Sequence, residues 1–231
     1  MTKMRLIEAI FQPTNQSLHT LIFGKSGSGK SYFNIHLLKA AISDRISFPK
    51  NHRFIIIDPK TQPGDYDQIS TPLDGLNPKE IAESISENRV TLIWPDYDNV
   101  VEIVEYIIEI LFSFADAVSD FSATFILDEA GELITHTTMP KNIGKLAVQG
   151  RAKKIKGVFL NQRPILNRKL DSQVESLILF DMIDIDSDNL MKRWGLNYDK
   201  WVPKIQEEKH SFLLVHFVNN IEQIFDPIKL I

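Results

Sequence analysis

The sequence predicts an α/β fold in which a mainly parallel central sheet is flanked by helices and extended by a C-terminal antiparallel hairpin. Apolar runs of strand length recur along the chain with helical segments between them, which is typical of a parallel sheet. Most of these runs are continuous, as in strands buried on both faces. A glycine-rich segment joins the first run directly to a helix. The chain has 231 residues, 43% of them hydrophobic, which suits a single domain over 1–231 with a core at 18–180 and a C-terminal extension at 186–231.

The predicted elements follow one another in a regular order. Strands are expected at 20–23, 53–58, 90–94, 123–128, 157–161 and 177–180. Helices are expected at 30–43, 78–87, 100–118, 141–154 and 187–194. The first helix has apolar residues at helical spacing, and the second begins at Pro78 after Asn77, a favourable N-terminus. The third is the most apolar segment, but acidic residues interrupt it, so we expect a core helix and not a membrane span. Residues 212–218 and 221–225, separated by two asparagines, predict the hairpin.

The glycine-rich segment matches the P-loop pattern G-x-x-x-x-G-K-[ST] at every fixed position. It consists of Gly24, Lys25, Ser26, Gly27, Ser28, Gly29, Lys30 and Ser31. Glycines let the backbone turn its N–H groups toward phosphate oxygens, and the following helix N-terminus adds positive potential. Lys30 is expected to reach the β- and γ-phosphates, and Ser31 to hold Mg²⁺. The pattern therefore predicts that the chain binds a nucleoside triphosphate together with Mg²⁺.

A second motif follows about a hundred residues later. Residues 125–129 (FILDE) are an apolar strand ending in two acids, which is typical of a Walker B segment. Asp128 is expected to hold the Mg²⁺ shell. Glu129 is expected to act as general base on the attacking water, which favours hydrolysis over transfer to a small acceptor.

Composition excludes several other classes of site. The chain has no cysteine, so disulfides, thiol catalysis and Cys-ligated metals are absent. Its six histidines do not have the spacing of a metal site. The net charge is −4, yet 133–170 holds nine lysines and arginines and no acid. Such asymmetry favours a local surface for a polyanion, although a solvated basic face balancing acidic neighbours would look the same.

Three further segments resemble the FtsK–HerA branch of P-loop motor ATPases over about 18–180. Residues 55–60 (IIIDPK), followed by Tyr66, are similar to the end of the second strand in FtsK-type motors. Residues 157–164 (GVFLNQRP) are similar to the strand that ends in TQRP. Arg151 stands eleven residues before Gln162, where this branch places an arginine. Asp58 and Lys60 would form an ion pair or cap the strand, and their role stays open.

The resemblance implies a single P-loop NTPase domain of the RecA/ASCE type that binds ATP and Mg²⁺, and it implies roles for these residues. Gln162 would end a strand beside the Walker B strand and sense the γ-phosphate through the catalytic water. Arg151 would reach the γ-phosphate of a neighbouring subunit, with Arg163 and Arg168 as alternatives, as arginine fingers do. A surface or DNA-backbone arginine is the competing interpretation of Arg151.

Within this branch the chain most resembles the genome-packaging ATPases of membrane-containing icosahedral, tectivirus-like viruses, because it is short and lacks a membrane span and a terminal DNA-reading domain. The resemblance implies an ATP-driven double-stranded DNA translocase, a homo-oligomer that is a hexameric ring, and capsid or membrane-vertex partners. Its location would be the host cytoplasm during assembly, and a capsid vertex in the virion. The expected DNA contacts are Lys141, Lys145, Lys153, Lys154 and Lys156. The alternatives are a cellular or conjugative HerA/FtsK-type DNA pump and a non-motor P-loop ATPase or kinase.

Overall fold

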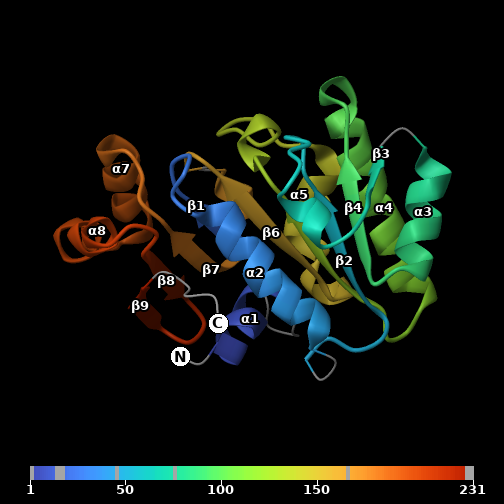
Figure 1. Cartoon of the computed structure of the whole chain (residues 1–231), viewed down its shortest axis with the longest axis horizontal. Helices are drawn as coiled ribbons and strands as arrows, with labels where there is room; N and C mark the ends of the chain where they lie inside the picture. Colours follow the sequence, from blue (N-terminus) through green and yellow to red (C-terminus); the bar gives the residue numbers. More distant parts are fainter. Residues whose placement is uncertain (1–2, 14–18, 45–46, 75–76, 165–166, 227–231) are drawn as a thin grey trace.

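The computed structural model describes residues 3–13, 19–44, 47–74, 77–164 and 167–226, which form a nine-stranded sheet with helices on both faces (Figure 1). The strand order is β3-β4-β2-β5-β6-β1-β7-β8-β9. The strands are β1 (His19–Phe23), β2 (His52–Ile57), β3 (Pro72–Asp74), β4 (Val90–Trp94), β5 (Ser122–Leu127), β6 (Ile155–Asn161), β7 (Val174–Leu179), β8 (Phe212–His216) and β9 (Ile221–Phe225). Neighbouring strands from β3 to β7 are parallel, and β8 and β9 add an antiparallel hairpin. The predicted fold class is therefore confirmed.

The helices cover the sheet in two layers. They are α1 (Lys3–Phe11), α2 (Lys30–Ser43), α3 (Pro78–Glu87), α4 (Val100–Ala117), α5 (Lys141–Gln149), α6 (Arg168–Asp171), α7 (Asp184–Trp194) and α8 (Tyr198–Glu207). α1 and α2 pack with Ile56 and Ile126 on one face, and α3 to α5 pack with Ile55 and Phe125 on the other (Figure 1). Because alternate residues of the same strand enter different cores, both faces are apolar, which explains the continuous apolar runs of the sequence.

Parallel pairing brings four loops to one edge of the sheet. Phe23 at the end of β1 is opposite Asn161 of β6, and Ile57 at the end of β2 is opposite Leu127 of β5. The segments that follow β1, β2, β5 and β6 therefore emerge side by side. This carboxyl edge holds the P-loop and the Walker B acids.

Some predicted bounds are wrong. The helix predicted at 141–154 ends at Gln149, and a 3₁₀ turn, Arg151–Lys153, follows it. A side chain at Gly150 would come within 2.6 Å of the Ile155 carbonyl, so the chain turns closely here. Lys154, at φ 54°, then redirects the backbone into β6. The helix predicted at 187–194 begins earlier, at Asp184.

Among the α-helices and β-strands of the described residues, four have no counterpart in the prediction: α1, β3, α6 and α8. β3 and α6 are only three and four residues long. α8 contains Pro203, which usually ends a helix. α1 nevertheless matters, because the backbone carbonyls of its last turn accept hydrogen bonds from Thr20 of β1 (3.0 Å) and Thr124 of β5 (2.6 Å).

Candidate active site

The P-loop connects β1 to α2, as the sequence predicts. Gly27 and Gly29 have φ angles of 74° and 102°, in the left-handed region that favours glycine. Gly29 precedes the first residue of α2, and no side chain caps that helix end. The first N–H groups of α2 are thus open toward an anion such as a phosphate. Gly24 is needed for close approach, because a side chain there would come within 2.6 Å of Phe180 Cβ.

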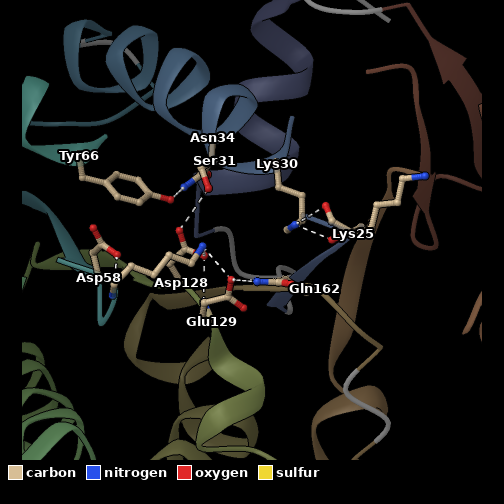
Figure 2. Close-up of polar contacts among 11 residues, drawn as sticks. Lys25, Lys30, Ser31, Asn34, Asp58, Tyr66, Asp128, Glu129 and Gln162 are labelled. Atoms are coloured by element: carbon tan, nitrogen blue, oxygen red, sulfur yellow. Dashed lines mark hydrogen bonds and ion pairs between the residues drawn. The ribbon is translucent and has the colours of Figure 1, made fainter. Parts of the chain in front are cut away.

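Lys30 lies inside the loop. Its Nζ donates hydrogen bonds to the carbonyl oxygens of Gly24 and, at 3.1 Å, Lys25 (Figure 2). The residue is only 5% exposed. Burial lowers the pKa of Lys30, while the charge of Glu129 opposes this effect. The ammonium group is therefore held by main-chain oxygens that a phosphate group could replace.

Oxygen atoms suited to Mg²⁺ gather below the first turn of α2. The Ser31 hydroxyl donates to Asp128 Oδ2 at 3.4 Å. Asp128 is fully buried after β5, and burial raises its pKa, with Lys60 opposing. Asp58, after β2, is also buried, and its pKa rises to about 6 through burial and the neighbouring Asp128.

The donor chemistry fits Mg²⁺. One oxygen of Asp58 accepts the Lys60 N–H at 3.2 Å, and within the described residues the other has no partner although it is buried. Hydroxyl and carboxylate oxygens are the ligands that Mg²⁺ and its bound waters prefer. Ser31 and Asp128 would hold the ion.

Glu129 and Gln162 face each other across the ends of β5 and β6. Gln162 Nε2 donates to Glu129 Oε1 at 2.8 Å, and Lys60 Nζ lies 2.7 Å from the same oxygen (Figure 2). Burial alone would raise the pKa of Glu129, but the hydrogen bonds from Lys60 and Gln162 outweigh it and lower the pKa. The predicted place of Gln162 beside the Walker B strand is confirmed. This arrangement can orient a carboxylate next to the P-loop.

The structure decides between the two interpretations of Asp58 and Lys60. Asp58 accepts the main-chain N–H of Lys60 and caps the strand end. The Lys60 side chain instead pairs with Glu129 and, at 3.5 Å, with Asp128. Tyr66 is fully buried nearby and accepts a hydrogen bond from Asn34 Nδ2 at 2.9 Å.

Two contacts to the P-loop have no signal in the sequence. Lys25 forms an ion pair with Asp181, just after β7. His210, which precedes β8, contacts the Ser28 carbonyl through Nδ1 at 3.0 Å. These partners are 156 and 182 positions away along the chain, so only the folded sheet brings them to the loop.

The predicted arginines lie at different edges of the sheet. Arg151 is exposed in the 3₁₀ turn before β6, at the amino ends of the strands. Arg163 follows the end of β6, at the same edge as the P-loop, and Arg168 begins α6 on the connection from β6 to β7. A seven-residue strand separates the two edges by roughly 20 Å. Arg151 is thus remote from the P-loop of its own chain.

The five predicted DNA contacts do not form one surface. Lys141 and Lys154 are exposed, Lys145 lies over the ring of Phe112 at 4.2 Å, and Lys153 pairs with Asp116. The prediction for Lys156 is wrong, because its side chain is buried under α1.

Lys156 Nζ bonds to the Ala9 carbonyl at 2.6 Å and pairs with Glu175 at 3.2 Å. A charged group held inside the protein in this way cannot contact a phosphate backbone.

Two pockets border these elements. One of about 670 Å³ is lined by cationic groups from α5, α6 and α7, namely Lys141, Arg168, Lys169 and Arg193. A second, of about 400 Å³, is lined in part by Glu129, Gln162 and Arg163. Within the described residues there is no metal-binding group of three or more His, Cys, Asp or Glu, and no helix long and apolar enough to cross a membrane.

Comparisons with solved structures agree with this fold. The genome-packaging NTPase B204 from Sulfolobus turreted icosahedral virus 2, in complex with AMPPCP, superposes with a TM-score of 0.66 at 16% identity, covering 92% of this chain and 98% of that one. VirB4 of Thermoanaerobacter pseudethanolicus gives 0.63 at 11% identity, covering 92% and 89%. The cytoplasmic domain of the Thermomonospora curvata type VII secretion ATPase EccC gives 0.56 at 14% identity, covering 90% of this chain and 25% of that one.

The family comparison covers most of the chain. No curated protein matches the sequence. The family model of the central domain of helicase HerA matches residues 2–210. Together with the P-loop, the Walker B acids and Gln162, this match shows that the chain belongs to the HerA central-domain family, of the FtsK–HerA type.

Proposed function

We propose that this protein is an ATP-driven double-stranded DNA translocase that packages a viral genome into a capsid. The observation that supports hydrolysis most directly is the 2.8 Å hydrogen bond from Gln162 to Glu129 beside the P-loop. A carboxylate fixed there by an amide is suited to activating water, whereas a kinase would align a substrate hydroxyl. The viral part of the proposal is supported by the likeness in fold and length to the packaging NTPase B204.

The residues divide the chemistry between them. The open N–H groups at the start of α2 and Lys30 bind the phosphates, and Ser31 and Asp128 hold Mg²⁺, which neutralises the charge of the phosphate oxygens when bound. Glu129 accepts a proton from the attacking water. Gln162 holds the Glu129 carboxylate in place and senses the γ-phosphate through that water.

Coupling to DNA requires a partner subunit and a track. Arg151 is at the far edge of the sheet from its own P-loop, so it acts on the nucleotide of a neighbour in a homo-oligomeric, hexameric ring. Lys141 and Arg168, at the cationic pocket, are suited to DNA phosphates, and exposed Lys154 and partly exposed Lys145 and Lys153 are further contacts. Contacts to phosphates suit a motor that must move any sequence.

The location follows from the proposed role. The motor works in the host cytoplasm during assembly and engages capsid or membrane proteins at a vertex of the virion. A cellular or conjugative DNA pump of the same family is the second candidate, supported by the likeness to VirB4.

Steady-state ATP hydrolysis, measured with and without long duplex DNA, tests the proposal. We expect DNA to stimulate the wild type, Lys30→Ala to abolish hydrolysis, and stimulation to fall steeply with added salt. Lys156→Arg is a matched control, because this lysine is buried and should not change the salt dependence. A rate of ATP hydrolysis that duplex DNA does not change at any salt concentration, or phosphate transfer to a small acceptor, would contradict the proposal of a translocase.

A further inference from the structure

Two acidic residues stand side by side at the end of β5 with little access to water. Asp128 is fully buried and Glu129 is 8% exposed. Adjacent buried carboxylates repel each other and need a compensating cation. In the described part of the chain, both of their ion pairs are made with one side chain, that of Lys60.

The charge of the P-loop lysine also favours the ionised form of both acids, but in the described part of the chain Lys30 forms no ion pair with either of them. Lys30 Nζ is bound to the main-chain oxygens of Gly24 and Lys25, on the other side of the loop (Figure 2). Lys60 therefore supplies the positive charge that is in direct contact with the acids, while Lys30 is hydrogen-bonded to the P-loop backbone.

Hydrogen bonds of the main chain fix the position of the Lys60 backbone. Its N–H is bound by Asp58 Oδ1 at 3.2 Å, and the Thr61 N–H is bound by the Asp58 carbonyl at 3.3 Å. Asp58 itself is 1% exposed at the end of β2, a strand that pairs with β5. The base of the Lys60 side chain is therefore attached to the same rigid sheet as the acids it reaches.

The contact also orients Glu129. Lys60 follows β2 and Gln162 follows β6, the two strands that flank β5, and both side chains contact Oε1 of Glu129. Among the described residues, no donor contacts Oε2. One carboxylate oxygen is thus anchored twice, which leaves the other to accept a proton from water.

We propose that Lys60 is a positioning residue for ATP hydrolysis, which holds Glu129 in its reactive orientation and balances the charge of the Asp128–Glu129 pair. The proposal rests on the proposed ATPase function. Lys60 acts through Glu129 and does not bind nucleotide. A merely structural ion pair would change stability alone, whereas a positioning residue changes the chemical step and leaves nucleotide binding intact.

The first test separates chemistry from binding. We expect Lys60→Met to lower the single-turnover hydrolysis rate about tenfold or more, with the dissociation constant of a fluorescent ATP analogue changed less than about threefold. Lys60→Arg should restore most of the rate, because it keeps the charge and the donors. Lys79→Met, which removes an exposed lysine paired with Glu83 on α3, is the matched control.

A double-mutant cycle identifies the residue through which Lys60 acts. In a Glu129→Gln background, Lys60→Met should lower the hydrolysis rate little further, because the carboxylate that Lys60 positions is already lost. An equal cost in both backgrounds, or a rate unchanged by Lys60→Met alone, would overturn the proposal. If the methionine variant does not fold, Lys60→Gln, which keeps a donor without the charge, takes its place in the cycle.

A measurement without turnover completes the test. In the absence of nucleotide, Lys60→Met should lower the thermal midpoint of unfolding. Mg²⁺ alone should raise the thermal midpoint of the variant more than it raises the thermal midpoint of the wild type. Equal responses to Mg²⁺ would contradict the charge-balancing role. A wild type that does not hydrolyse ATP contradicts the proposed function instead, so the two failures are distinguishable.

Discussion

The Gln162 amide donates to Glu129 Oε1 at 2.8 Å across the carboxyl ends of two neighbouring parallel strands. We expect Gln162→Ala to lower kcat about tenfold or more with little change in KM for ATP, because the carboxylate loses an anchor and not a phosphate contact. Gln162→Glu should be more severe, since it places a second carboxylate against the first. Steady-state kinetics at saturating Mg²⁺ measures both, and a rise in KM with kcat unchanged would show that Gln162 binds substrate instead.

Local motifs made much of this site predictable. The P-loop, Asp128, Glu129 and Gln162 each end a strand, and parallel strands end at the same edge, so their meeting follows from the fold class. The partner of Lys60 did not follow in this way. The partner of this lysine is set by the strand that lies next to β2. Because β2 pairs with β5, the acids at the end of β5 come within its reach.

The position of Lys156 shows why some of the site was missed. The sequence predicts that this strand begins at residue 157, which leaves Lys156 outside it. In the structure β6 begins at Ile155, and Lys156 lies on the face covered by α1. Since α1 was not predicted, nothing in the sequence indicated a cover for this lysine. The run of basic residues therefore predicts one surface, although the strand turns one of its members inward.

The buried pair of Lys156 and Glu175 gives a prediction about stability. Lys156→Met should lower the free energy of unfolding by about 3 to 5 kcal/mol, because it leaves a buried carboxylate without its lysine. The double variant Lys156→Met/Glu175→Gln should recover much of this loss. Urea denaturation measures both. If the double variant is as unstable as the single one, the loss comes from packing and not from the carboxylate that has lost its lysine.

Two buried histidines predict a dependence of stability on acid. Burial lowers the pKa of His52 to about 3 and that of His19 to about 4. The unfolded chain takes up these protons near pH 6.5, so the free energy of unfolding should fall as the pH drops below that value. The slope is about 1.4 kcal/mol per pH unit for each histidine, and it persists down to about pH 4 for His19 and pH 3 for His52.

The contribution of His52 can be isolated by substitution. Its ring contacts the hydroxyls of Ser122 at 2.8 Å and Thr124 at 3.0 Å, partners that a glutamine amide can also bond. We expect His52→Gln to be less stable than the wild type at neutral pH but to lose stability less steeply on acidification. Parallel slopes for the two proteins between pH 6.5 and 4.5 would rule out His52 as the source.

The position of Arg151 predicts complementation between two inactive variants. It precedes β6 at the edge of the sheet opposite the P-loop, so we expect it to act on the nucleotide of a neighbouring subunit. Arg151→Ala and Lys30→Ala should each be inactive alone. When they are mixed, the intact P-loop of one variant meets the intact arginine of the other at about a quarter of the interfaces of a randomly assembled ring. Hydrolysis should therefore reappear in the mixture. Arg163, at the P-loop edge, is the matched comparison: if mixtures containing Arg163→Ala recover activity and those containing Arg151→Ala do not, Arg163 is the residue that acts on the neighbouring subunit.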